Sequence, residues 1–260
     1  MTVPLTWWRL DLAYDGTPFA GWARQPGRRT VEGELEAALA VVLGEPVRLS
    51  VAGRTDAGVH ALGQVASFAT TATVDPRRLR LGLSALLPAE VSVTAVTPAA
   101  AGFSARAAAA RTYRYRLWLP DWRPVFERAF VWDVRGAVDR DLLDAAAALL
   151  PGRRDFAALT PSARFYHTCE REVRRAAWST AAGGREACFE ITADGFLHNM
   201  VRVAVGSMVD VAQGRMSLAS LADGLAGRRR AALGRTAPAR GLALVRVDYA
   251  EDPTEGPAID

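Results

Sequence analysis

Lysine is absent from this sequence: all 32 of its basic residues are arginine. The absence excludes a Walker-type phosphate loop and a lysine Schiff base, because both require the lysine ammonium group. A compositional bias of the genome explains the missing lysine at least as well as selection for phosphate contacts. No apolar run in the sequence reaches the length of a membrane span. We therefore expect an arginine-rich protein that does not cross a membrane.

Cysteine and histidine are scarce. Two cysteines, Cys169 and Cys188, are typical of a reducing compartment rather than a disulfide framework, and residues 1–12 lack the apolar stretch of a secretory signal. We therefore expect a cytoplasmic protein. The cysteines, His167 and His198 do not form a C-x-x-C or H-x-x-x-H pair, so we predict no metal site. No nucleophile elbow and no dinucleotide fingerprint occur either.

The arginines are clustered, which is more informative than the modest net charge of +4. Three segments contain such clusters, and a protein with separate basic patches can follow a polyanion. Each cluster alone is more often a solvated face. The clusters are Arg24, Arg28 and Arg29; Arg106, Arg111, Arg114 and Arg116; and Arg228, Arg229, Arg230 and Arg235.

The hydrophobic pattern of the first half predicts the order βαββαβ. Gly44 follows the end of the first expected helix, and Asp75-Pro76 caps the start of the second. This order is typical of a ferredoxin-like (split βαβ) unit, an antiparallel sheet with helices on one face. The expected strands are 7–14, 47–52, 64–70 and 91–97, and the expected helices are 31–43 and 76–87.

The second half repeats this order loosely. Residues 98–110 look irregular, and residues 151–170 are expected to form a loop, which at this length usually has a function. We predict an α+β fold of two ferredoxin-like subdomains, 1–105 and 106–250, with antiparallel sheets side by side and a central cleft, followed by a flexible tail, 251–260. The expected strands are 112–119, 130–134, 171–179, 186–192 and 242–249; the expected helices are 141–150, 196–213 and 218–225.

Asp56 lies in the segment that narrows the function most, Arg54-Thr55-Asp56-Ala57-Gly58-Val59-His60. Gly53 and Gly58 let the backbone bend tightly between two expected strands. A loop held by two strands is a good place for a single reacting group. Aspartate is also common in turns because its side chain bonds to nearby backbone N–H groups. The spacing alone leaves both roles open.

An expected strand and an expected helix could contribute to the same site. In the strand, alternation puts Tyr113 and Tyr115 on one face and Arg114 and Arg116 on the other. Such a strand could stack a base and hold phosphates, or it could simply be half-buried with a solvated face.

The helix 196–213 is apolar except for a narrow stripe, which either lines a cleft or faces solvent. An enclosed Arg202 in that stripe would need a carboxylate partner. The stripe consists of His198, Asn199, Arg202, Asp210 and Gln213.

Several segments, in order, resemble the tRNA pseudouridine synthase A family. The segment 53–61 is similar to the catalytic motif of that family. Ala23 stands where glutamine is expected, and the loop around Cys169-Glu170 is atypical; these departures affect details of tRNA contact. The other similar segments lie within residues 9–249: Tyr14-Asp15-Gly16 with Phe19-Ala20-Gly21-Trp22, Arg29 to Leu35, Phe103 to Arg106 with Arg111 to Tyr115, Phe196-Leu197 with Met200-Val201-Arg202, and Ala237 to Leu242.

The resemblance implies the pseudouridine synthase fold and the isomerisation of uridine to pseudouridine at positions 38, 39 and 40 in the anticodon stem-loop of tRNA, with no cofactor. It implies Asp56 as the nucleophile, attacking either the ribose C1′ or the uracil C6. Arg54 would fill the space of the flipped base or hold its phosphate, and Arg202 would pair with Asp56. Tyr113 would stack on the uracil and Leu242 would close the apolar wall of the pocket. A homodimer that binds tRNA with both subunits is also implied.

Two other functions stay open from the residues alone. A non-catalytic RNA-binding protein of ferredoxin-like fold would use the same sheets and arginines without altering uridine. A small-molecule enzyme that combines Asp56 with His60 would not need the dispersed basic clusters.

Overall fold

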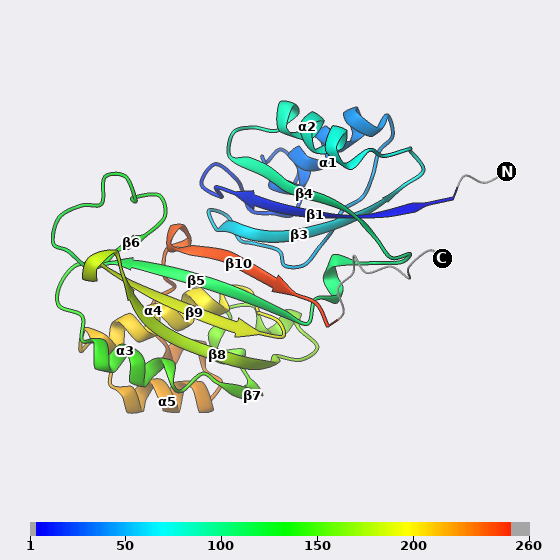
Figure 1. Ribbon diagram of the computed structural model, residues 1–260. Helices are drawn as coiled ribbons and strands as arrows, with labels where there is room; N and C mark the ends of the chain where they lie inside the picture. The colour runs from blue at the N-terminus through cyan, green and yellow to red at the C-terminus, as the bar shows by residue number, and fades with distance from the viewer. Residues whose placement is uncertain (1–3, 251–260) are drawn as a thin grey trace. The chain divides into compact units, whose positions relative to one another are not determined.

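A computed structural model of the chain describes residues 4–250, which fall into two compact units (Figure 1). The first unit contains the described residues up to Arg111 and those from Leu244 onward; the second is Thr112–Ala243. Two strands, β5 (Ala110–Trp118) and β10 (Leu242–Asp248), have residues in both units. The expected tail 251–260 lies outside the described residues.

The first unit has the predicted βαββαβ order. Its strands follow the order β4-β1-β3, with β2 on the other side of β3, and all of these pairings are antiparallel. The two helices pack against each other over the sheet (Figure 1). The ferredoxin-like prediction for this half is therefore confirmed. The elements are β1 (Thr6–Tyr14), α1 (Val31–Leu43), β2 (Ser50–Val51), β3 (His60–Thr70), α2 (Pro76–Leu86) and β4 (Val91–Ala99).

Local sequence signals set the boundaries of these elements. The Thr30 hydroxyl accepts the Gly33 N–H at the start of α1, and Gly44, with a φ of 73°, ends this helix in the left-handed conformation. Asp75 caps α2 in the same way. In β1 every second residue from Trp8 onward is buried, which is the alternation expected of a strand with one covered face.

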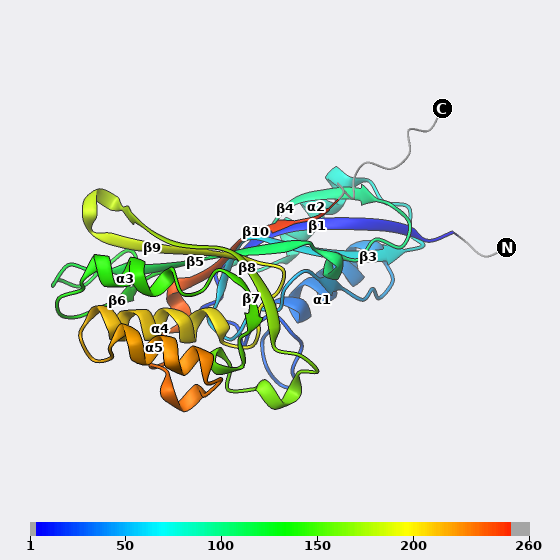
Figure 2. The same cartoon turned by 90° about the horizontal axis from the view of Figure 1, so that it is seen from below.

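The second unit contains a sheet, and its α-helices Arg140–Ala147, Met200–Ala212 and Leu218–Ala226 lie on the same side of that sheet (Figures 1 and 2). The strand order β10-β5-β9-β8 repeats the order β4-β1-β3-β2 of the first half, so the predicted duplication extends to strand order. Strand β7 extends this order at β8, and β6 runs parallel to β5. The remaining elements are β6 (Trp132–Asp133), α3 (Arg140–Ala147), β7 (Gly152–Asp155), β8 (Glu170–Ala181), β9 (Glu186–Ala193), α4 (Met200–Ala212) and α5 (Leu218–Ala226).

Two sequence-based expectations for this unit are wrong in part. Residues 151–170 are not a loop throughout, because Gly152–Asp155 forms β7, paired with β8, and two short 3-10 turns follow. The side chains of β7 are largely exposed, so its sequence shows no apolar alternation. The helix expected from residue 196 begins at Met200 instead, because Asn199 adopts the left-handed conformation with a φ of 62°.

Candidate active site

The loop that carries Asp56 is anchored by its neighbour Thr55. The buried Thr55 hydroxyl lies 2.8 Å from the Tyr14 hydroxyl, and the Gln64 amide donates to that hydroxyl and to the Gly53 carbonyl, at 3.2 and 2.7 Å. Burial raises the pKa of Tyr14 to about 12, although both hydrogen bonds oppose the shift. Tyr14 therefore keeps its proton at physiological pH, and the network holds the backbone immediately before Asp56.

The segment 14–22 lies against the same loop, backbone to backbone. The Trp22 N–H donates to the Thr55 carbonyl at 3.0 Å. A Cβ atom on Gly21, whose φ is +99°, would come within 2.8 Å of that carbonyl oxygen, and one on Gly16 would collide with the Val59 carbonyl. Only glycine permits so close an approach at these two positions.

Arg111 ties down the start of the loop. Its Nε and Nη2 atoms donate to the Ala52 carbonyl at 2.9 and 2.8 Å, and its guanidinium also reaches the carbonyls of Arg106 and Ala108. One member of the second arginine cluster thus has a structural role inside the protein.

Asp56 itself is half-buried, and Arg54, two residues earlier, is exposed. The Asp56 carbonyl accepts the Val59 N–H at 3.1 Å, which closes the turn. The buried His60 ring accepts the Gly16 N–H at Nδ1, 3.0 Å away. His60 therefore helps to fasten the segment 14–22 to the loop. The sequence had suggested His60 only as a catalytic partner of Asp56, four residues away, and not this structural role.

In the second unit, Tyr113 lies on β5 and is buried. Its ring packs edge-on against the ring of Phe196, with the centroids 4.9 Å apart. As predicted, Tyr113 and Tyr115 share the buried face of this strand, and Leu117 lies on the same face.

The arginines on the other face of β5 make ion pairs with acidic side chains of β9. Arg114 lies 2.7 Å from Glu190, and Arg116 lies 2.8 Å from Glu186. The structure therefore favours a half-buried strand with a polar outer face, the alternative to a phosphate-binding face.

Tyr115 fixes the segment that leads into β10. Its hydroxyl donates to the Pro238 carbonyl at 2.7 Å, and a Cβ atom on Gly241 would come within 2.5 Å of its ring. Burial raises the pKa of Tyr115 above its usual range. The next residue, Leu242, is buried at the start of β10.

The guanidinium of Arg202 is oriented by two oxygen atoms of the second unit. Its Nε donates to the Ala237 carbonyl at 2.8 Å and its Nη1 donates to the Asn199 side chain at 2.7 Å. The Ala237 N–H returns a hydrogen bond to the Arg202 carbonyl at 3.0 Å. The position of Arg202 thus depends on where the chain runs near Ala237.

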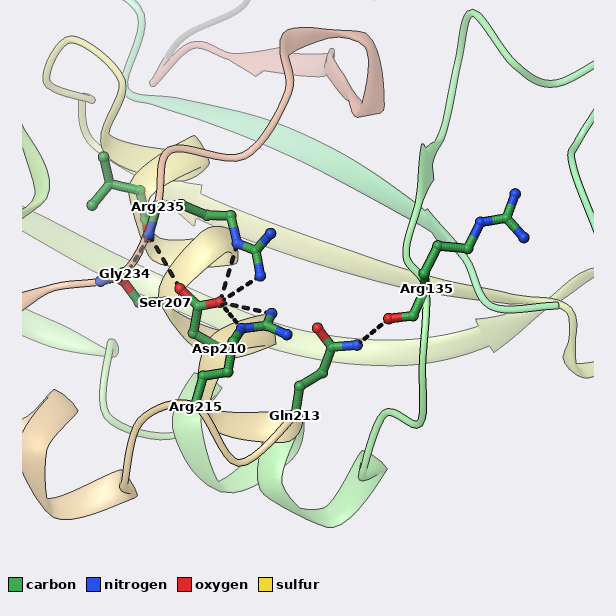
Figure 3. Close-up of polar contacts among 8 residues, drawn as sticks. Arg135, Ser207, Asp210, Gln213, Arg215, Gly234 and Arg235 are labelled. Atoms are coloured by element: carbon green, nitrogen blue, oxygen red, sulfur yellow. Dashed lines mark hydrogen bonds and ion pairs between the residues drawn. The ribbon is translucent and has the colours of Figure 1, made fainter. Parts of the chain in front are cut away.

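Asp210 lies about two turns after Arg202 on α4. Its carboxylate holds Arg235, which precedes Ala237 in the chain (Figure 3). Its side chain is only 12% exposed, and its carboxylate accepts hydrogen bonds from the Arg235 backbone and guanidinium and from Arg215. Ser207 accepts the Gly234 N–H in the same turn of the helix. Burial alone would raise the pKa of Asp210, but the arginine hydrogen bonds outweigh it and the pKa is lowered.

The predicted polar stripe of this helix therefore has partners within the second unit. Besides Asp210 and Arg202, the Gln213 side chain donates to the Arg135 carbonyl at 2.6 Å (Figure 3). Arg202, Asp210 and Gln213 thus contact chain segments outside the helix, at Ala237, Arg235 and Arg135.

The structure thus divides the predicted site residues between the units. Arg54 and Asp56 belong to the first, and Tyr113, Arg202 and Leu242 belong to the second. Neither Tyr14 nor Gln64 was predicted to support the Asp56 loop, and Asp210 was not predicted to support the chain near Arg202. A polar side chain in a strand or helix that is otherwise apolar is the one signal that could have found Gln64 and Asp210.

Within residues 4–250, no group of three or more histidine, cysteine or acidic side chains is arranged to hold a metal ion. Cys169 and Cys188 are both free and buried. Each helix within residues 4–250 is too short or too polar to span a bilayer.

Comparison with known proteins identifies related sequences. The sequence profile of a family described as tRNA pseudouridine synthase matches residues 12–106 and 146–250, which include Asp56, Arg202 and Leu242 but not Tyr113. The tRNA pseudouridine synthase A of Moorella thermoacetica is 41% identical, over 93% of this chain and 98% of its own. The proteins of the same name from Geotalea uraniireducens and Cutibacterium acnes are 40% and 43% identical, over 93% and 95% of this chain and 98% and 90% of their own.

Replacing Asp210 with asparagine should weaken the second unit, because the arginines lose a charged acceptor. We expect the free energy of unfolding at pH 7 to fall by about 2 kcal/mol, measured by urea denaturation. The Asp210 pKa is lowered by folding, so its contribution is present above the unfolded pKa near 3.8 and is lost as pH falls through the folded value. The difference between wild type and variant should therefore shrink below about pH 4.

The exposed Asp223 of α5 provides the matched control. Asp223→Asn should unfold at the wild-type urea concentration at both pH values. Equal stability of Asp210→Asn and wild type at pH 7 would contradict the role given to Asp210.

Proposed function

Because the chain belongs to the tRNA pseudouridine synthase family, we propose that it isomerises uridine to pseudouridine at positions 38, 39 and 40 in the anticodon stem-loop of tRNA. The observation that carries this proposal is the Asp56 loop. It holds one half-buried carboxylate on a backbone fixed by buried hydrogen bonds, with an exposed arginine two residues before it. Preorganised support of this kind suits a reacting group.

The proposed reaction exchanges one bond of the nucleoside for another. The N1–C1′ glycosidic bond breaks, a C5–C1′ bond forms, C5 loses its proton and N1 gains one. Nothing is oxidised or reduced and no group leaves the nucleoside, so the balance requires no cofactor. A nucleophile that attacks C1′ or C6 would divide the exchange into two easier steps.

Asp56 is the proposed nucleophile, and Arg54 is proposed to assist access to the base. A uridine stacked in an RNA stem must leave the stack to react, which costs a few kcal/mol. An exposed guanidinium is suited to fill the space of the flipped base or to hold its phosphate. The exposure of Arg54 beside the fixed Asp56 backbone supports this division of roles.

The second unit is proposed to supply the remainder of the pocket. Arg202 would pair with Asp56 and favour its charged form, and its orientation by Ala237 and Asn199 supports a fixed direction of approach. Tyr113 would stack on the uracil and remove the C5 proton. Leu242 would form the apolar wall. We also propose a homodimer in which one tRNA contacts both subunits.

The first test of this function replaces Asp56 with asparagine, which keeps the shape and removes the nucleophile. Tritium release from tRNA labelled at C5 of uridine should fall by at least about 10⁴-fold, while the Kd for tRNA stays near the wild-type value. Asp223→Asn should release tritium at the wild-type rate. Appreciable turnover by Asp56→Asn would refute the assignment, and a wild-type protein that binds tRNA without releasing tritium would be a non-catalytic RNA-binding protein.

Tyr113→Phe tests the proposed proton transfer separately from stacking. The variant keeps the ring and loses the hydroxyl, so the single-turnover rate of tritium release should fall about a hundredfold with an unchanged Kd for tRNA. Tyr249→Phe is the matched control, because the Tyr249 hydroxyl donates to the Ala105 carbonyl, a structural contact in the first unit. Full activity of Tyr113→Phe would show that its hydroxyl has no part in proton transfer.

A further inference from the structure

The segment 160–168, which we call the 160–168 loop, is fastened to the residues that lead into α4. The Ser162 hydroxyl lies 2.8 Å from Nδ1 of His198, and the His198 backbone N–H donates to the Tyr166 hydroxyl at 2.9 Å. Ala163–Phe165 forms a 3-10 turn at the tip of this loop. The loop is therefore held in one conformation at both sides of its tip.

Phe165, in that turn, is a large aromatic side chain that faces solvent. It is 74% exposed, and the guanidinium of Arg164 lies over its ring, 4.8 Å from the centroid. An exposed ring beside a guanidinium is the arrangement that proteins use to stack an unpaired base while holding the adjacent phosphate. Stacking of this kind tolerates any base, because every base has a flat π face.

The charge around Phe165 fits a polyanion. The sequence has no acidic residue between Asp155 and Glu170. The Arg171 guanidinium donates to the carbonyls of Thr168 and Glu170 and lies 5.8 Å from the centroid of the Tyr166 ring, which adds a second positive charge to this loop. A single-stranded RNA segment has the two groups that suit this surface: a flat base to stack on the Phe165 ring and a phosphate to pair with the Arg164 guanidinium.

The attachment of the loop connects it with two residues of the proposed pocket. Phe196, two residues before His198, packs on Tyr113, and Asn199, the residue after it, accepts a hydrogen bond from Arg202. We infer that Phe165 and Arg164 stack on an unpaired nucleotide that flanks the target uridine. This inference rests on the proposed function for the identity of the RNA.

The experiment measures RNA binding in the Asp56→Asn protein, so that no conversion occurs. The probe is a fluorescently labelled tRNA anticodon stem-loop, and its Kd is measured by anisotropy. Adding Phe165→Ala should raise the Kd about tenfold, whereas Phe165→Trp should keep the parent value. Phe126→Ala is the matched control, because Phe126 is 88% exposed on another segment of the same unit; it should leave the Kd unchanged.

A second readout identifies the stacked nucleotide. With 2-aminopurine placed at each loop position in turn, one position flanking the target should be quenched by the parent protein and not by Phe165→Ala. An unchanged Kd for Phe165→Ala, an equal loss with Phe126→Ala, or quenching that is the same in both proteins would overturn the inference. Tritium release by the wild type is measured separately, so failure of the proposed activity is distinguishable from failure of the stacking platform.

Discussion

The hydrogen bond between the buried hydroxyls of Thr55 and Tyr14 is the interaction on which the candidate active site depends. It sits directly before Asp56 in the chain, and the Gln64 amide extends it to the Gly53 carbonyl. Breaking it would leave polar atoms unpaired in a dry environment, which costs about 1–3 kcal/mol. The backbone that carries Asp56 is therefore restrained on the side of Gly53 and Thr55, although the glycines of this loop would otherwise allow it to move.

In the second unit, a longer series of contacts orients the guanidinium of Arg202. Asp210 holds Arg235, the chain continues to Ala237, and the Ala237 carbonyl orients the guanidinium of Arg202. Tyr115 secures the following turn through Pro238. In both units a proposed site residue thus lies beside backbone that is held by a buried polar side chain, Tyr14 before Asp56 and Asp210 near Arg202.

The sequence predicted the elements better than it predicted these supports. The end of the first helix was placed correctly because Gly44 is a strong local signal, whereas β7 was missed because an exposed edge strand needs no apolar alternation. The family motif singled out Asp56. Hydrogen bonds such as that from Arg111 to the Ala52 carbonyl join residues far apart in the chain and depend on tertiary structure, so no local pattern reveals them. The spacing of the arginine clusters did not reveal that several of their members have partners inside the protein, as Arg114, Arg116 and Arg235 do.

The most direct test of the central claim is the single-turnover rate of tritium release by Thr55→Val, compared with Thr55→Ser. Valine keeps the shape of threonine and removes the hydroxyl, so the Tyr14 contact is lost while the carboxylate of Asp56 remains. A small displacement of a reacting group is worth about a hundredfold in rate. We predict a fall of that size for Thr55→Val with an unchanged Kd for tRNA, and a rate near wild type for Thr55→Ser. A wild-type rate for Thr55→Val would contradict the account.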